Sequence, residues 1–166
     1  MIYVGIDPGL SGGISVFNTQ EFMNDNREIL FIPSGAYKMP RTEKDLSDFF
    51  GKLYEQAKRA DWKIFAVIEK VNSMPGQGIA SAWKFSGNYH GCRMAMICND
   101  IPFDEVRPRE WQKEFIPPKK KEESKVHHKN RLKAKAQQLF PHITVTHAIA
   151  DALLIGEYLR RMKTQS

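Results

Sequence analysis

The sequence has 166 residues, 42% of them hydrophobic and 27% charged, which is ordinary for one folded domain. Its formal net charge of +6 favours a polyanionic partner. Cys92 and Cys98 lie close together in an expected helix, so they are too few for a zinc cage and badly placed for a disulfide. No apolar run approaches the roughly 20 residues that cross a membrane. Because a strand-like run begins at Ile2, we expect no signal peptide and a cytoplasmic protein.

Three short runs near the start are rich in β-branched residues and separated by turn residues. They predict strands at 2–6, 13–17 and 29–32, connected most simply as an antiparallel meander. Thr42 can cap a following helix, whose apolar residues recur every three or four positions. This helix leads into residues 64–68, IFAVI, an apolar run typical of a central strand buried on both faces.

The second half of the chain is predominantly helical. We expect a helix over 79–98, a strand over 103–106 and a short helix that begins at Pro108. The basic segment 119–135 is expected to belong to a further helix, and 147–162 to the last one. With no repeat and no linker, we interpret the whole chain, residues 1–166, as a single α/β domain.

Three acidic residues occupy unusual positions. Asp7 and Glu69 end two buried strands, and Asp151 lies within the apolar helix HAIADALLIGEYL. Acids are seldom buried without a partner, and Lys70 beside Glu69 must point to the opposite face of its strand. If the three converge, divalent cations such as Mg²⁺ or Mn²⁺ would relieve their repulsion most simply. Two such ions roughly 3.5–4 Å apart can activate a water and stabilise a leaving oxygen in phosphodiester hydrolysis.

The turn that contains Asp7, in VGIDPGLSGGISV, allows two interpretations. A plain hairpin turn would account for its glycines and proline. Alternatively, the glycines leave room beside an acidic ligand for a metal or a phosphate.

The positive charge is concentrated in one segment. Residues 119–135 contain eight Lys or Arg and two Glu, so the net charge of this segment equals that of the whole chain. A solvated helix face is the common fate of such runs, but an ordinary face mixes charges of both signs. Candidate phosphate contacts are therefore Lys119, Lys120, Lys121, Lys125, Lys129, Arg131 and Lys133.

Several motifs in this order resemble the RuvC-type Holliday junction resolvases, especially small stand-alone members from phages and prophages. They are GIDPG, IEKV, MPGQG, WKFSGNYHG, VRPREWQK and ADALLIGEY, and they cover nearly the whole chain. The resemblance implies an RNase H-like fold, with a mixed five-stranded sheet flanked by helices on both faces. It also implies a homodimer, in a bacterial or phage-infected cell, that cuts branched DNA, above all four-way junctions, at two symmetric phosphodiesters.

By this resemblance Asp7, Glu69 and Asp151 are catalytic metal ligands for Mg²⁺, with Mn²⁺ possible and two ions expected. Where small members carry a further aspartate, this sequence has His147, one helical turn before Asp151. This histidine can ligate Mn²⁺ or carry a proton, and the alternative is a helix-start histidine without a metal role. Lys125 aligns loosely with a family lysine near the scissile phosphate.

The loop MPGQG follows the strand that ends in Glu69, where family members touch the open centre of a junction. Met74 is a candidate apolar wedge between bases, and Gln77 a further DNA contact; a plain connecting turn is the alternative. The helix over 79–98 is expected to form core and dimer interface rather than a base-stacking platform.

Two other functions remain open at this point. One is a junction-binding protein that has lost efficient cleavage because His147 replaces an acid. The other is an actin-like or sugar-kinase-like ATPase, since GIDPGLSGG also resembles the phosphate loop of that fold. The chain is short for the second domain that such ATPases close over a nucleotide, and no adenosine-binding motif is evident.

Overall fold

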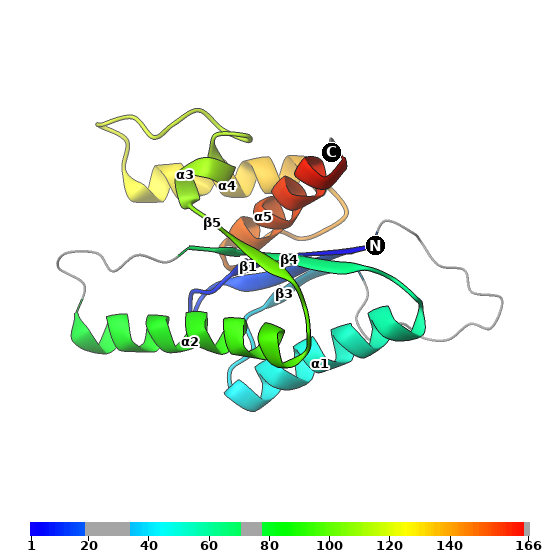
Figure 1. Cartoon of the computed structure of the whole chain (residues 1–166). Coiled ribbons are helices and arrows are strands. Elements are labelled where there is room, and N and C mark those ends of the chain that lie inside the picture. Colours follow the sequence, from blue (N-terminus) through cyan, green and yellow to red (C-terminus); the bar gives the residue numbers. More distant parts are fainter. Residues whose placement is uncertain (19–33, 71–77, 165–166) are drawn as a thin grey trace.

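The computed structural model describes residues 1–18, 34–70 and 78–164 (Figure 1). Its strands are β1 (Ile2–Asp7), β2 (Gly13–Asn18), β3 (Gly35–Lys38), β4 (Ile64–Glu69) and β5 (Phe103–Val106). Its helices are α1 (Glu43–Arg59), α2 (Ile79–Cys98), α3 (Pro108–Gln112), α4 (Lys125–Leu139) and α5 (His147–Thr164).

The strands form one mixed sheet in the order β3-β2-β1-β4-β5. β2 pairs antiparallel with both β1 and β3, whereas β1, β4 and β5 run parallel. Helices α1 and α2 cover one face of the sheet, and α3, α4 and α5 lie on the other (Figure 1). The predicted mixed five-stranded sheet with helices on both faces is therefore confirmed.

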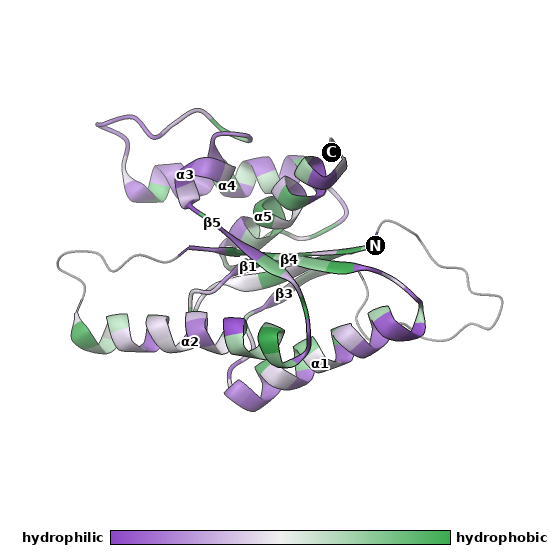
Figure 2. Cartoon of the chain, viewed as in Figure 1, coloured by the Kyte–Doolittle hydropathy of each residue, from purple (hydrophilic) through white to green (hydrophobic). Residues whose placement is uncertain are grey.

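Each face of the sheet has its own hydrophobic core. Along β1, Ile2, Val4 and Ile6 pack toward α1 and α2, while Tyr3 packs toward α5. Much of β4 and α5 is hydrophobic, and the connection between α3 and α4 is mostly hydrophilic (Figure 2). Because side chains alternate between the two faces along each strand, the position of a residue in its strand decides toward which face its side chain points.

α5 packs unusually close to the centre of the sheet because glycines face each other there. A Cβ on Gly5 would lie 2.6 Å from the carbonyl oxygen of Ala152 and also meet the backbone of Gly156. The Ser15 hydroxyl donates a 2.7 Å hydrogen bond to that same Ala152 oxygen. This close approach fixes the height of α5 above β1 and β2.

Two expected elements differ from the prediction. The strand expected at 29–32 lies outside the described residues, and the third strand of the sheet is β3. The helix in the basic segment does not include residues 119–124; it begins at Lys125. Ser124 caps its first turn by accepting a hydrogen bond from the His127 amide at 3.1 Å, and the preceding residues form a turn in which the Glu123 amide bonds to the Lys120 carbonyl.

Other local predictions are confirmed. Thr42 caps α1 by accepting a 3.0 Å hydrogen bond from the Asp45 amide. Cys92 and Cys98 are both free thiols. Among the described residues, no helix is long and apolar enough to cross a membrane.

Candidate active site

Asp7 and Glu69 lie side by side because they end two neighbouring parallel strands. Ile6 pairs with Ile68 in the β1–β4 register, so the next residues are neighbours at the same sheet edge. Strand alternation turns both acids away from α1 and α2 and toward α5. Lys70 points the other way, as predicted, and its ammonium lies 3.3 Å from the Glu105 carboxylate.

Asp151 reaches the same edge from α5. It directly precedes Ala152, whose carbonyl accepts the Ser15 hydrogen bond and lies above Gly5 of β1. Because Gly5 and Gly156 have no side chains, α5 packs close to β1, and this places Asp151 near the ends of the strands. The acid is only partly exposed, although its neighbours on α5 are buried.

The three carboxyls act on one another electrostatically. Burial raises the pKa of Glu69 from 4.5 to about 8, and the charges of Asp7 and Asp151 add to the rise. Burial, followed by the charge of Asp7, raises the pKa of Asp151 from 3.8 to about 7. The pKa of Asp7 is raised mainly by burial. The acids predicted from the sequence therefore form one coupled group that disfavours three negative charges.

Each strand-end acid is held by one short hydrogen bond. The Gly9 amide donates to Oδ1 of Asp7 at 3.1 Å, and the indole of Trp111 donates to Oε1 of Glu69 at 2.9 Å. Sequence reasoning missed the role of Trp111. A buried indole N–H needs a hydrogen-bond acceptor, so a tryptophan in a short helix beside the predicted acids could have been expected to bond to one of them.

The glycine turn fits closely around Asp7. A Cβ on Gly12 would lie 2.9 Å from Oδ2 and 2.7 Å from Cγ of Asp7, so any larger residue would displace the carboxylate. A Cβ on Gly13 would lie 2.5 Å from the Tyr37 carbonyl in the neighbouring strand. The segment is a hairpin between antiparallel β1 and β2, and Gly12 leaves the room that the Asp7 carboxylate occupies.

Lys129 is the lysine whose charge lowers the pKa values of Asp7, Glu69 and Asp151 alike. It lies on α4, one helical turn after Lys125, the residue that sequence reasoning placed nearest the chemistry. Lys125 is the exposed first residue of that helix. Among the described lysines, the electrostatics of the acid group therefore single out Lys129.

The acids fit a divalent cation in donor chemistry but do not form a closed cage. Carboxylate oxygens are the ligands that Mg²⁺ prefers, and a cation would offset their mutual repulsion. In the described part of the chain, however, no group of three or more His, Cys, Asp or Glu side chains is arranged to hold a metal ion. His147 is the exposed first residue of α5.

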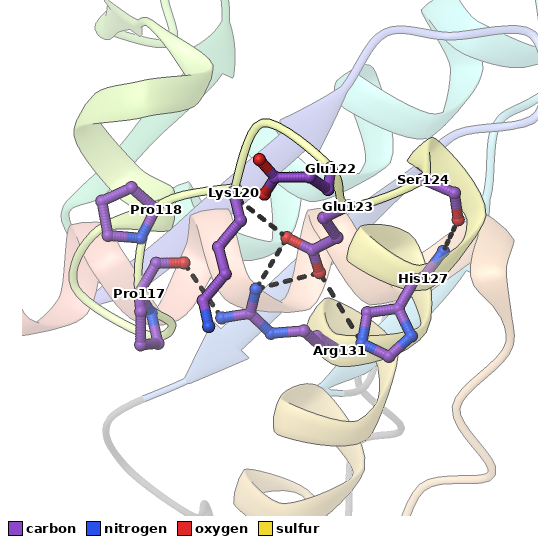
Figure 3. A pocket seen from close by; sticks show the side chains of 8 residues that line it. All are labelled: Pro117, Pro118, Lys120, Glu122, Glu123, Ser124, His127 and Arg131. Atoms are coloured by element: carbon purple, nitrogen blue, oxygen red, sulfur yellow. Dashed lines mark hydrogen bonds and ion pairs between the residues drawn. The ribbon is translucent and has the colours of Figure 1, made fainter.

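The predicted DNA contacts fall into three groups. Lys119, Lys120, Lys121, Lys125 and Lys129 are exposed, and Lys133 is half-buried. Arg131 is engaged within the protein, where its guanidinium donates to Glu123 at 2.9 and 3.0 Å and to the Pro117 carbonyl at 3.0 Å (Figure 3). The loop residues Met74 and Gln77 lie outside the described residues.

Two solved structures of Thermus thermophilus RuvC match this chain, one of them in complex with a Holliday junction substrate. Each is 15% identical with a TM-score of 0.57, and the matches cover 99% of this chain and 97% or 98% of those chains. The chain has a RuvC-like fold. Its α/β architecture is thus the RNase H-like one that the motifs implied. No protein-family model and no curated protein matches the sequence, and the resemblance to phage members stays a prediction.

Proposed function

We propose that this chain is a divalent-metal-dependent endonuclease that cuts branched DNA, with the four-way Holliday junction as its main substrate. The observation that carries the proposal is the coupled group of Asp7, Glu69 and Asp151 at one sheet edge. The RuvC-like fold supports the nuclease class, and the exposed lysines of the α3–α4 connection and α4 support a polyanionic substrate.

In the proposed mechanism, Asp7, Glu69 and Asp151 would hold two Mg²⁺ ions, or Mn²⁺ in their place. Such ions would supply activation of the attacking water and stabilisation of the leaving oxygen of the phosphodiester. Trp111 and the Gly9 amide each fix one carboxylate oxygen, which leaves the second oxygen of Glu69 and of Asp7 to a ligand. The positive charge of Lys129 attracts the scissile phosphate toward the acids.

We further propose that two copies of the chain pair through α2, so that two sites act on two strands. Four large apolar side chains of α2 are more than half exposed: Ile79 at 88%, Trp83 at 80%, Met94 at 55% and Ile97 at 53%. Their spacing places them on one side of the helix. Burying this stripe against a second copy matches the twofold character of a four-way junction.

A junction-binding protein without cleavage is the second candidate. It is favoured by the exposed position of His147 and by the open arrangement of the acids. Such a protein would fold identically and keep the lysines of α4, so only an assay of cleavage separates the two.

The test is cleavage of a labelled synthetic four-way junction beside linear duplex, in Mg²⁺ and separately in Mn²⁺. We expect paired symmetric nicks in the junction, with 5′-phosphate and 3′-hydroxyl ends, and their loss in Asp7→Asn. Tight junction binding without nicks in either metal would replace the nuclease with the binding protein.

A further inference from the structure

A cavity of about 670 Å³ lies between α3, α4 and the connection between them. We call it the α3–α4 cavity. Its apolar wall consists of Ile116, Pro117 and Pro118, and its cationic side chains are Arg109, Lys113 and Lys119. Among the residues that the structure describes, no Asp or Glu lines it. The cavity therefore combines an apolar surface with three positive charges, the combination that binds a nucleotide by its base or sugar and its phosphate.

The three cations are available to an external anion. Arg109 and Lys113 are exposed and lie one helical turn apart, and Lys119 is exposed on the connection. In the described part of the chain, no ion pair joins any of the three to a carboxylate. Three unneutralised positive charges around one cavity favour a phosphate group over a neutral ligand.

The walls of the cavity are held in place before any ligand arrives. In the neighbouring pocket that Figure 3 draws, Arg131 donates to the Pro117 carbonyl and pairs with Glu123, which holds Pro117 in place. On the opposite wall, Nε2 of His128 lies 3.1 Å from Oε1 of Gln112, a hydrogen bond that links α4 to α3. A preformed cavity binds its ligand without the entropic cost of ordering its walls.

The cavity and the acid group share the helices α3 and α4. Trp111 bonds to Glu69, and the next residue of α3, Gln112, lines the cavity. On α4, Lys129 acts on the acids, and the preceding residue, His128, lines the cavity. α3 and α4 therefore connect the acid group to the cavity, so a DNA strand held at one can extend to the other.

We propose that the α3–α4 cavity binds a nucleotide of the cleaved strand that flanks the scissile phosphodiester. Its phosphate contacts Arg109, Lys113 and Lys119, and its sugar or base packs on Ile116 and the two prolines. This proposal rests on the proposed function, and it adds Arg109 and Lys113 to the DNA-binding residues expected from the basic segment. It makes the cavity a second anchor that sets the strand in register with the acids.

The first test compares two double variants in the cleavage-deficient Asp7→Asn background. Arg109→Ala with Lys113→Ala removes two charges at the cavity, and Lys52→Ala with Lys58→Ala removes two exposed charges from α1 on the opposite face of the sheet. We expect the cavity variant to bind four-way junctions about tenfold more weakly, with a slope of log affinity against log salt reduced by about 1. Equal losses in both variants would show general attraction and overturn the proposal.

The second test identifies the source of the phosphate and needs neither cleavage nor a junction. Backbone amide NMR signals of residues 109–116, 119 and 128 are followed during titration with a thymidine trinucleotide or with inorganic phosphate. We expect shifts with the trinucleotide at concentrations where phosphate gives none. Equal responses to both would overturn the assignment to DNA. If the wild-type protein cuts no junction but binds the trinucleotide here, the proposed function fails while the cavity's ligand stands.

Discussion

At Glu69, burial and two neighbouring acids raise the pKa of the carboxyl to about 8. The folded protein therefore retains a proton that the unfolded chain loses near pH 4.5, and stability falls as pH rises between these two values. We expect Glu69→Gln to increase the unfolding free energy of the metal-free protein at pH 9 by at least about 1.4 kcal/mol, the equivalent of one pKa unit. Denaturant unfolding at pH 5 and pH 9 measures the difference.

The matched control for this prediction is Glu122→Gln, which alters an exposed carboxylate on the α3–α4 connection. Its unfolding free energy should change little at either pH. At pH 5 the gain from Glu69→Gln should be much smaller, because folded Glu69 is still protonated and most of the fall in stability lies above this pH. A gain that is the same at both pH values would mean that Glu69 is not electrostatically strained.

Trp111 tests the positioning of the same acid. Its indole favours the charged form of Glu69, so Trp111→Phe should raise the pKa of that carboxyl further. We expect the acidic limb of the pH profile of cleavage to move up by about one unit, since an indole bond to a charged group is worth roughly 1.5–3 kcal/mol. Trp62→Phe, at a half-buried position on the other face of the sheet, should leave the profile unchanged. Reduced cleavage with an unshifted profile would reduce Trp111 to a packing role.

Among the elements, the position of α5 depends on Gly5 and Gly156, which allow the helix to pack closely on the sheet. A Cβ at Gly156 would lie 2.7 Å from the Phe17 ring and also meet the Ser15 hydroxyl. We expect Gly156→Ala to destabilise the fold by about 2 kcal/mol and to reduce cleavage, because Asp151 moves away from the strand ends. Thermal unfolding together with the junction assay measures both effects.

Gly87 of α2 provides the comparison, because a Cβ there would have no atom within 4 Å. Gly87→Ala should stabilise α2 by roughly 0.5–1 kcal/mol through the lower entropy cost of helix formation. If Gly156→Ala lowered neither stability nor cleavage, the position of Asp151 would not depend on the close packing of α5.

The sequence alone predicted the elements whose signals are local. The strand ends that carry Asp7 and Glu69 follow from short apolar runs, and the apolar helix around Asp151 follows from its composition. The parallel pairing of β1 with β4, which makes the two strand ends neighbours, is a finding of the structure. The bond from Trp111 to Glu69 and the approach of Lys129 depend on where α3 and α4 settle on the sheet. The spacing of apolar residues within a helix does not predict where that helix packs on the sheet.

The basic segment shows the same limit. Its charge was evident, but the fold divides it into a turn at 119–124 and a helix, and it commits Arg131 to Glu123. Pairing between residues eight positions apart across a turn has no signature in charge composition. The number of positive charges therefore predicted a basic surface correctly. It did not show which residues are exposed lysines and which, like Arg131, form ion pairs within the protein.

For the whole molecule, the exposed stripe on α2 predicts the oligomeric state. We expect the wild-type protein to sediment as a dimer and Trp83→Glu to sediment as a monomer, because the charge introduced into the stripe would be buried on pairing. Val126→Glu alters an exposed apolar residue on α4 and should leave the dimer intact. A monomeric wild-type protein, or a dimer that survives Trp83→Glu, would contradict pairing through α2.

The central claim is that Asp7, Glu69 and Asp151 share divalent cations. The most direct measurement is the anomalous diffraction of crystals grown with Mn²⁺, from the wild-type protein and from Glu69→Gln. We predict anomalous peaks between the three carboxylates in the wild-type protein, and weaker or missing peaks in the variant. A wild-type crystal with Mn²⁺ elsewhere and none between these acids would contradict the account.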